Sequence, residues 1–312
     1  MKKVGIIGGA GFIGSHITKR FLNNGFQVKV STTDLSKKEK YEHLKKLYYN
    51  ENLSFSELKL EHKDQLQDFV KDCDVVIHSG TPFQLDFKDA TTELLEPTIK
   101  GTENFLEVVN MSHSVKKVVI IASVAAYNTH FPLPPSNKTP DDTICETEAP
   151  FMSEESHPYA QAKFMANAVV NNFIQNNPNA TFEITSISPV GVFGKALSQR
   201  QDSTSTGLQY LIKNNLAPNP FMQMLYDTNA EMAIVNVTDV ARAVYKAATS
   251  TGLHGKNYLL SSESYAMADI HLMLNNKAPQ NQAKIIYQNQ LAKQELDMNF
   301  LSVKDTLIQY NL

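Results

Sequence analysis

Short apolar runs alternate with amphipathic stretches along the first part of the chain. The run Val4–Ile7 is followed by a stretch, Ser15–Asn24, in which Ile17, Phe21 and Leu22 recur at helical spacing. This alternation repeats up to about residue 187 and predicts an α/β fold with a doubly wound, mostly parallel sheet. We expect strands at Val4–Ile7, Gln27–Ser31, Leu53–Glu57, Val75–His78, Val118–Ala122 and Phe182–Ile187, and helices at Ser15–Asn24, Lys63–Lys71, Glu93–Val109 and Tyr159–Ile174.

The pattern loosens from about residue 188 onward. Lys195–Thr206 is polar and shows no periodicity, and residues 215–221 look like a loop. Further on, Val237–Ala248 predicts a helix that packs against the main sheet, and Tyr258–Leu260 predicts a short strand. This part of the chain therefore forms a smaller lobe that is partly interleaved with the main sheet.

Composition and charge mainly exclude classes of function and partner. The chain has 312 residues and a net charge of −3, with no basic stripe, which argues against a nucleic-acid partner. No apolar run reaches the length of a membrane span, and the start lacks the apolar core of a signal peptide. We therefore expect a cytoplasmic protein without a membrane partner. Cys73 and Cys145 are too few for a disulfide framework or a metal site of the usual spacing, and we expect no metal.

A glycine cluster directly follows the first apolar run. Gly8, Gly11 and Gly14 lie between the expected strand and the expected helix. Glycines at such a turn allow a tight bend, a close approach of the backbone to a phosphate, and close packing of the helix on the strand. The N–H groups and the positive end of the helix dipole then face the phosphates. The arrangement predicts a dinucleotide site.

A second set of residues has the spacing expected of an acid–base site. Ser123 directly follows the apolar run 118–122, so its hydroxyl would reach the crevice at the carboxyl end of a strand. Tyr159 and Lys163 are four residues apart on a predicted helix and therefore share a face. An ammonium group beside a phenol lowers the pKa of the tyrosine, which makes Tyr159 a usable proton donor or acceptor.

Taken in order, the glycine cluster, Ser123 and Tyr159-x-x-x-Lys163 resemble the extended short-chain dehydrogenase/reductases of the NAD-dependent epimerase/dehydratase superfamily. Four further stretches resemble motifs of its dihydroflavonol 4-reductase and cinnamoyl-CoA reductase-like branch: Asp74–Phe83, Glu96–Thr102, Ile187–Gly194 and Val235–Ala243. The likeness covers residues 1 to about 262. It implies a Rossmann domain that binds NAD(P) over 1–187, with 235–250 packing back onto it, and a smaller substrate-binding lobe over 188–312.

The resemblance also implies roles for individual residues. Tyr159 would donate the proton, Lys163 would bind the nicotinamide ribose and lower the pKa of Tyr159, and Ser123 would polarise the substrate carbonyl. The residues expected to bind the cofactor are Gly8, Gly11, Phe12, Ile13, Gly14, Thr32, Thr33, Asp34, Lys40, Ser79, Gly80, Thr81, Lys163 and Pro189. The residues expected to contact the substrate are Pro82, Phe83, Asn128 and Phe193.

The end of the second expected strand bears on the choice between NAD and NADP. NAD enzymes usually place an acid there, but Thr32 occupies that position and Asp34 lies two residues further on. Dihydroflavonol reductases place an arginine at the next position, which here is Thr33. The hydroxyl groups of this turn and nearby lysines such as Lys40 can bind a 2′-phosphate. We expect NADP, with NAD held through Asp34 as the alternative.

The resulting expectation is an NAD(P)H-dependent oxidoreductase, a monomer or homodimer, that reduces a small-molecule aldehyde or ketone or oxidises the alcohol. Two alternatives stay open: a nucleotide-sugar epimerase or dehydratase of the same branch, and a non-catalytic protein that senses NAD(P). Val124–Ala126 provides no acid or base for a dehydratase, and 188–312 contains only Arg200 and Arg242 to bind a nucleotide diphosphate. Sensing proteins can lose the tyrosine or the lysine, whereas this chain has both.

Overall fold

A parallel sheet of seven strands, in the order β3-β2-β1-β4-β5-β6-β9, forms the centre of the molecule. The computed structural model describes residues 2–80, 89–139, 142–199 and 204–310. The strands are β1 (Lys3–Ile7), β2 (Gln27–Thr32), β3 (Leu53–Glu57), β4 (Val75–His78), β5 (Lys117–Ile121), β6 (Glu183–Pro189) and β9 (Asn257–Leu260). The chain runs outward from β1 to β3, returns to β4 beside β1 and continues outward on the other side. The doubly wound α/β fold predicted from the sequence is therefore confirmed.

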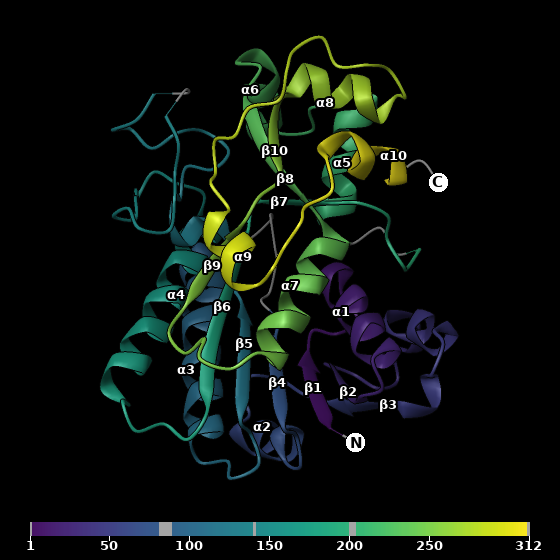
Figure 1. Cartoon of the computed structure of the whole chain (residues 1–312), viewed down its shortest axis with the longest axis vertical. Helices are drawn as coiled ribbons and strands as arrows, with labels where there is room; N and C mark the ends of the chain where they lie inside the picture. Colours follow the sequence, from purple (N-terminus) through teal and green to yellow (C-terminus); the bar gives the residue numbers. More distant parts are fainter. Residues whose placement is uncertain (1, 81–88, 140–141, 200–203, 311–312) are drawn as a thin grey trace.

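Helices cover both faces of this sheet (Figure 1). One face carries α1 (Phe12–Asn23) and α7 (Val237–Thr249), and the other carries α2 (Lys63–Val70), α3 (Glu96–Asn110) and α4 (Pro158–Asn176). In β4, Val75 and Ile77 belong to the core beneath α1 and α7, whereas Val76 belongs to the core on the opposite face. Strands that are apolar on both faces are typical of a parallel sheet buried between helices.

A smaller lobe lies beyond the carboxyl ends of the large sheet, at the top of Figure 1. Its elements are β7 (Gly191–Phe193), β8 (Glu231–Asn236), β10 (Glu263–Ala266), α5 (Thr204–Asn214), α6 (Pro220–Asp227), α8 (Met267–Leu274) and α10 (Val303–Tyr310). The strands form a second sheet in the order β10-β8-β7, with β7 parallel and β10 antiparallel to β8. The lobe has a core of its own, which includes Phe193, Met232 and Ile270.

Short helices join the main elements. Pro97 is the second residue of α3, where a proline is tolerated because the first N–H groups of a helix have no partner within it. The turn that leads into α3 is π-helical. The short helices are η1 (Lys38–Lys40), η2 (Glu42–Lys46), η3 (Asn50–Asn52), η4 (Thr91–Leu95), η5 (Val124–Ala126) and α9 (Gln290–Glu295).

The second half of the chain differs from the sequence-based expectation in two places. The strand expected at Tyr258–Leu260 pairs with β6 and joins the large sheet as β9, so it is part of the main layer and not of the smaller lobe. The stretch expected to be a loop includes the start of α6. Asn219 caps this helix, because its Oδ1 accepts a hydrogen bond from the N–H of Met222 at 3.0 Å. α7 packs next to α1 on one face of the large sheet, and the division into a main domain and a smaller lobe stays a prediction.

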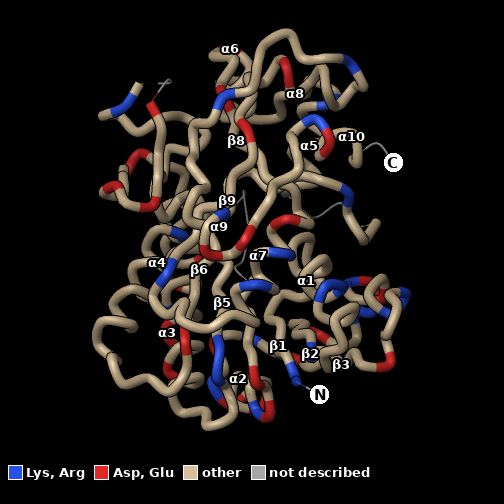
Figure 2. The backbone as a smooth tube through the Cα atoms, in the orientation of Figure 1, with Lys and Arg blue, Asp and Glu red and all other residues tan. Residues whose placement is uncertain are grey.

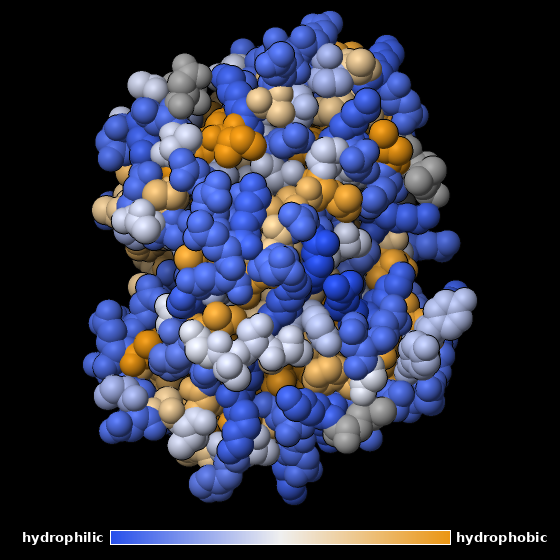
Figure 3. Space-filling view, in the orientation of Figure 1, coloured by the Kyte–Doolittle hydropathy of each residue, from blue (hydrophilic) through white to orange (hydrophobic). Residues whose placement is uncertain are grey.

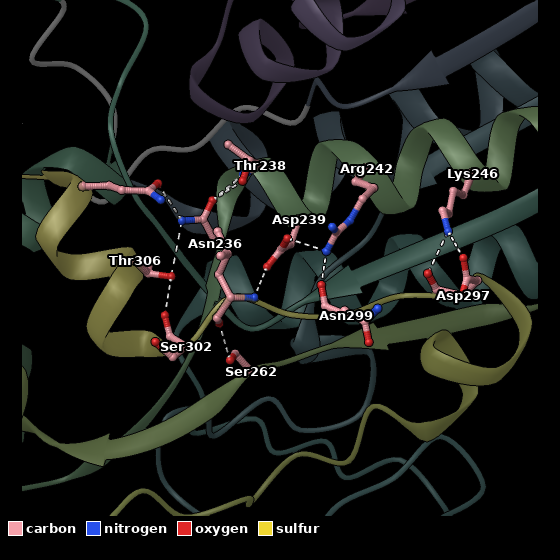
Figure 4. Close-up of polar contacts among 12 residues, drawn as sticks. Asn236, Thr238, Asp239, Arg242, Lys246, Ser262, Asp297, Asn299, Ser302 and Thr306 are labelled. Carbon is pink, nitrogen blue, oxygen red and sulfur yellow. Dashed lines mark hydrogen bonds and ion pairs between the residues drawn. The ribbon is translucent and has the colours of Figure 1, made fainter.

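Side-chain hydrogen bonds fasten the last described part of the chain to α7 (Figure 4). Asp239 accepts hydrogen bonds from Arg242 Nη2 and from the N–H of Leu301, each at 2.8 Å. Arg242 also donates to the carbonyl oxygen of Asn299. We call Asp239, Arg242, Asn299 and Leu301 the α7 clasp. It ties a segment of the smaller lobe to a helix that packs on the large sheet.

The surface mixes charges of both signs. Figure 2 shows Lys and Arg interspersed with Asp and Glu along the chain, and Figure 3 shows a mainly hydrophilic face with small separate groups of apolar side chains. Within the described ranges, no helix is both long enough and apolar enough to cross a membrane.

Candidate active site

Several residues that the sequence predicts to form the site lie at the carboxyl edge of the large sheet. Gly8 follows β1, Ser79 follows β4, Ser123 comes two residues after the end of β5, and Pro189 is the buried last residue of β6. Because these strands are parallel neighbours, their ends meet at one edge. β1 and β4 lie side by side while the chain leaves them in opposite directions, and open α/β sheets bind ligands at this point.

Close packing of backbone atoms fixes the conformation of the glycine turn after β1. Gly8 has a φ of +75°, and a Cβ atom added to it would lie 2.9 Å from the backbone of Gly80. A Cβ atom at Gly14 would lie 2.0 Å from the carbonyl oxygen of Gly8. The N–H of Gly8 donates to Ser31 Oγ at 3.0 Å, which ties the turn to β2. Side chains at Gly8 or Gly14 would therefore force the turn open.

The start of α1 fits an anionic group. Gly11 precedes the helix and has no side chain to cap it, and Phe12 and Ile13 in the first turn are only partly buried. The first N–H groups of a helix have no partner within it and favour negative charge. Close to Gly8, Ser79 Oγ is buried and has no hydrogen-bond partner among the described residues. A pyrophosphate suits this combination of glycine turn, uncapped helix start and unsatisfied hydroxyl.

Ser123 stands at the start of η5. Its Oγ accepts a hydrogen bond from the N–H of Ala125 at 3.2 Å, which caps this short helix. That bond uses the oxygen as an acceptor, so the hydroxyl hydrogen can be donated to an oxygen in the crevice. Ser123 is also partly exposed, whereas Ala122 and Val124 are buried. Its position suits the donor role predicted for it.

Lys163 brings the first turns of α4 to the same edge. Its Nζ donates a hydrogen bond to the carbonyl oxygen of Ile121, the last residue of β5, at 3.2 Å. Ile121 lies two residues before Ser123, and Tyr159 lies one turn before Lys163. In addition, α4 packs against η5. The three residues predicted to be catalytic therefore come from two elements that meet at the end of β5.

Burial governs the protonation of Tyr159 and Lys163. It lowers the pKa of Lys163 to about 8, and it raises the pKa of Tyr159 above its usual range. The sequence predicts that Lys163 lowers the pKa of Tyr159, but in this structure the loss of hydration around the phenol has the larger effect. Tyr159 is therefore a phenol at neutral pH, which is the form that can donate a proton.

His78 is a buried titratable group at the end of β4. Its ring contacts that of Phe105, with 4.7 Å between the centroids, on the face of the sheet covered by α3 and α4. Burial, together with the charge of Lys163, lowers the pKa of His78 to about 4. Its Nε2 has no hydrogen-bond partner within the described part of the chain. His78 is therefore neutral at pH 7, while Lys163 carries a positive charge below its pKa of about 8.

The residues after β2 form a turn of their own. Thr32 Oγ1 donates to the carbonyl oxygen of Asp34 at 3.2 Å. One carboxylate oxygen of Asp34 accepts from the hydroxyl of Ser36 at 2.6 Å and from its N–H at 2.8 Å. These bonds lower the pKa of Asp34, so its partly exposed carboxylate stays charged. Thr33 is exposed and Lys40 is half-buried. The acid of this turn is thus already engaged by its own loop.

Asn128, predicted to contact the substrate, is fully buried. Its Nδ2 donates to the carbonyl oxygen of Leu133 at 2.8 Å and to Tyr287 Oη at 2.9 Å, and its Oδ1 accepts from the N–H of His130 at 3.0 Å. The amide is therefore engaged in holding the segment after η5 in place. A substrate contact through Asn128 stays a prediction that this geometry does not favour.

The other predicted substrate residues fall in two groups. Phe193, at the end of β7, is 1% exposed and packs in the core of the smaller lobe, so its contact with substrate also stays a prediction. Pro82 and Phe83 lie outside the described residues, as does Thr81, which was expected to bind the cofactor.

The segment after Ser123 forms a cavity of about 290 Å³. Its lining includes Tyr127, Ile144 and Phe151, together with Lys138 and Glu148, which form an ion pair at 2.7 Å. Tyr127 Oη donates to the carbonyl oxygen of Asn257 at 3.0 Å, which links this segment to β9. The cavity has room for a small organic group.

One contact on the cofactor side is not predicted by the sequence. Ser15 Oγ donates to the carbonyl oxygen of Gly11 at 2.6 Å and lies 2.8 Å from Nε2 of His43, in η2. The proximity of His43 to the lysines at 37–40 could have drawn attention to it. Nothing in the sequence indicates that its ring turns toward the first turns of α1.

Comparison with known proteins places the chain in a family. The model of the NAD dependent epimerase/dehydratase family matches residues 4–261, and the chain belongs to this family. It is 30% identical over 258 residues to the cinnamoyl-CoA reductase CAD2 of Medicago truncatula, covering 80% of this chain and 74% of that protein. It is 24% identical over 250 residues to an anthocyanidin reductase of Arabidopsis thaliana, covering 78% and 71%. More particularly, it is an extended short-chain dehydrogenase/reductase of the dihydroflavonol reductase and cinnamoyl-CoA reductase-like branch, and an NAD(P)-dependent oxidoreductase.

Solved structures share the whole fold. The yeast methylglyoxal/isovaleraldehyde reductase Gre2, complexed with NADPH, superposes with a TM-score of 0.81 at 23% identity, covering 98% of this chain and 96% of that one. The UDP-glucuronic acid 4-epimerase of Bacillus cereus, in complex with NAD, superposes with a TM-score of 0.73 at 20% identity, covering 99% and 97%. At such low identity the likeness shows the fold alone.

Proposed function

We propose that this protein uses NADPH to reduce an aldehyde or ketone, or catalyses the reverse oxidation of the alcohol. The hydrogen bond from Lys163 Nζ to the carbonyl oxygen of Ile121 carries the proposal, because it holds the start of α4 beside Ser123. A protonated phenol, a hydroxyl and a lysine thus lie at the edge where the glycine turn suits a dinucleotide. The main domain would hold the cofactor and the smaller lobe the substrate, in a monomer or a homodimer.

Each catalytic group has a separate task. A bound nicotinamide cofactor supplies the hydride that reduces the carbonyl carbon. Tyr159 donates its phenolic proton to the carbonyl oxygen as the alcohol forms. Ser123 donates a hydrogen bond to the same oxygen and so stabilises the negative charge that develops there. Lys163, which is charged below its pKa of about 8, favours the phenolate that Tyr159 becomes.

The cavity in the segment after Ser123 has a mixed lining, with Tyr127, Ile144 and Phe151 beside Asn137, Lys138 and Glu148, which suits a carbonyl compound that carries both apolar and polar groups. The relatives are named as reductases, and the yeast neighbour was solved with NADPH. NADPH is favoured over NADH because Thr32, and not an acid, occupies the end of β2, and the acid that follows, Asp34, has one carboxylate oxygen bonded to Ser36.

A nucleotide-sugar epimerase or dehydratase is the competing function, since an epimerase shares the fold. Two features favour the reductase. Val124–Ala126 in η5 brings no acid or base next to Ser123. A nucleotide diphosphate is usually bound by several arginines after residue 188, but Arg242 is already bound to Asp239 in the α7 clasp and Arg200 lies outside the described residues. A panel of aldehydes, ketones and nucleotide-sugars, assayed by the absorbance of NADPH, separates the two functions.

The substitution Tyr159→Phe tests the proposed chemistry. It removes the proton donor and leaves the ring in place, so we expect kcat for carbonyl reduction to fall by roughly 10²- to 10⁴-fold. The Kd for NADPH, measured by fluorescence titration, should stay within about twofold, because the phenol is not needed to bind the cofactor.

The matched control for this variant is Tyr48→Phe, which removes the same hydroxyl from a side chain that is 84% exposed. This control should keep wild-type kcat. Undiminished turnover by Tyr159→Phe would refute the proposed mechanism, and steady interconversion of a nucleotide-sugar without net consumption of NADPH would favour the epimerase.

A further inference from the structure

We propose that Asn257, the first residue of β9, is a positioning residue for carbonyl reduction. It joins α4, which carries Tyr159 and Lys163, to the short helix that begins at Ser123. The inference rests on the proposed function and adds to it the residue that sets the spacing between Ser123 and Tyr159. No motif marks Asn257, which lies far beyond these residues in the chain.

The side-chain amide of Asn257 ties α4 to the large sheet. Its Nδ2 donates a hydrogen bond to Asn167 Oδ1 on α4 at 3.1 Å. Its Oδ1 accepts a hydrogen bond from Ser188 Oγ on β6 at 2.8 Å. Ser188 is fully buried, and a buried hydroxyl needs a partner within the protein. Both ends of the amide are therefore engaged, one with the helix and one with the sheet.

Ser188 lies at the level of Ser123 along the strands. It directly follows Ile187, whose carbonyl oxygen accepts a hydrogen bond from the N–H of Ala122 at 2.8 Å. Ala122 directly precedes Ser123. The bond from Ser188 to Asn257 therefore extends a line of contacts that runs from the residue before Ser123 across β6 to β9, the outermost strand on this side of the sheet (Figure 1).

The backbone carbonyl group of Asn257 holds the other part of the site. It accepts a hydrogen bond from Tyr127 Oη at 3.0 Å. Tyr127 directly follows η5, the short helix whose start is capped by Ser123. Burial raises the pKa of Tyr127, so its hydroxyl keeps the proton that it donates here. Asn257 thus bonds to the element of Ser123 through its backbone and to the element of Tyr159 through its side chain.

Asn167 gives α4 a second point of attachment. Tyr159, Lys163 and Asn167 are spaced four residues apart, so they share one face of the helix. Lys163 Nζ donates to the carbonyl oxygen of Ile121, and Asn167 binds Asn257 one turn further on. Two bonds on one face fix both the rotation and the tilt of the helix, whereas the apolar packing of η5 against α4 is non-directional.

The proposed reaction depends on this spacing. Ser123 and Tyr159 must both reach the same carbonyl oxygen, and hydrogen bonds between oxygen atoms span only about 2.5 to 3.0 Å. A displacement of about 1 Å can lower a rate by about a hundredfold. Asn257 acts through α4 and η5 and takes no part in the proton transfer itself. Its loss should therefore lower kcat and leave cofactor binding largely intact.

The substitution Asn257→Leu removes both bonds of the amide and keeps a side chain of similar shape and the backbone carbonyl group. We expect kcat for carbonyl reduction to fall by about tenfold, while the Kd for NADPH, measured by fluorescence titration, stays within about threefold.

The matched control is Asn177→Leu, at the end of α4 remote from Tyr159. Asn177 is also half-buried, and its Nδ2 donates to the carbonyl oxygen of Phe173 at 2.8 Å. This control loosens the same helix away from the site and should keep kcat within about twofold of the wild type.

A second substitution tests whether the two bonds of Asn257 act as one connection. Tyr127→Phe removes the hydroxyl that holds η5 and should also lower kcat by about tenfold, whereas Tyr48→Phe should not. Two bonds in series fix a distance only when both are present. The double variant with Asn257→Leu and Tyr127→Phe should therefore lose about tenfold in kcat, as each single variant does, and not about a hundredfold.

Thermal unfolding shows which variants keep the fold. If Asn257→Leu does not fold, Tyr127→Phe carries the test, and wild-type kcat in either variant that folds would overturn the inference. Multiplying losses in the double variant would also overturn it, because the two bonds would then act separately. An equal loss of kcat in Asn177→Leu would do the same, because any loosening of α4 would then be enough.

The failure of this inference differs from the failure of the proposed function. Turnover that is lost in Tyr159→Phe but kept in Asn257→Leu would overturn only the role of Asn257. A wild-type protein that reduces no aldehyde or ketone would overturn the proposed function and the role of Asn257 with it.

Discussion

The cofactor side of the molecule and its smaller lobe hold their residues in place by different means. On the cofactor side, backbone atoms close in sequence pack together, as Gly14 does on the carbonyl group of Gly8. In the lobe, side chains join segments far apart in sequence, as in the bond from Asn275 Nδ2 to the carbonyl oxygen of Lys213, and Asp239 of α7 binds the lobe through the N–H of Leu301. Close backbone packing at a turn requires one residue type, glycine, whereas many different pairs of polar side chains can form a hydrogen bond between two segments. A motif in the sequence therefore marks the first region and not the second.

The largest effect that would sharpen this comparison is expected from Gly14→Ala. The new Cβ atom would lie 2.0 Å from the carbonyl oxygen of Gly8, so the turn must open. We expect the Kd for NADPH to rise by at least about a hundredfold, and the free energy of unfolding to fall by about 3 kcal/mol, the upper part of the range for overpacking. Fluorescence titration and urea unfolding measure the two quantities.

A glycine of the smaller lobe is the matched control. Gly207 lies within α5, and a Cβ atom added there meets no atom within 4 Å. Gly207→Ala should therefore leave the Kd for NADPH unchanged and raise stability by about 0.5 kcal/mol, since alanine favours a helix. Wild-type affinity in Gly14→Ala would show that the cofactor side tolerates a change in its backbone packing, and the contrast between the regions would fail.

The same contrast explains how far the sequence could predict the molecule. The strands from β1 to β6 and the order of Gly8, Ser123 and Tyr159 followed from local patterns that need no knowledge of distant contacts. The position of β9 did not follow from a local pattern, because Tyr258–Leu260 is an apolar run that could pair in either sheet. Its pairing with β6 places it in the large sheet. The surroundings of Asn128 and the turn of the His43 ring depend on partners elsewhere in the chain, which no local pattern identifies.

Low pH should lower the free energy of unfolding through a buried histidine in each region. His78 lies at the cofactor edge, and His16 on α1 contacts the carbonyl oxygen of Lys195 after β7 through Nε2 at 2.9 Å. Burial lowers the pKa of each from 6.5 to about 4. The stability that each neutral ring contributes is therefore present above pH 6.5 and is lost as the pH falls toward 4, by at most about 3 kcal/mol each. Urea unfolding between pH 7 and pH 4.5 measures this loss.

A single variant separates the contribution of His16 from that of His78. His16→Gln keeps a side-chain N–H for the carbonyl oxygen of Lys195 but cannot titrate in this range. We expect it to remove about half of the acid-dependent loss while leaving stability at pH 7 within about 1 kcal/mol. A pH profile identical to that of the wild type would mean that His16 is not held neutral at the junction of α1 with the lobe.

The smallest of these effects is expected at the α7 clasp. Asp239→Ala leaves the N–H of Leu301 and the guanidinium of Arg242 without their carboxylate, and we expect a loss of about 2 kcal/mol, less than for a fully buried pair because Arg242 is partly exposed. Hydrogen exchange should then rise in the segment 299–310, while the Kd for NADPH stays unchanged. The control Lys246→Ala breaks a neighbouring ion pair with Asp297, which is 93% exposed, and should cost less than about 1 kcal/mol. If Asp239→Ala weakened NADPH binding as strongly as it loosened the lobe, the two regions would not be held independently, because the clasp would then support the cofactor turn through α7 and α1.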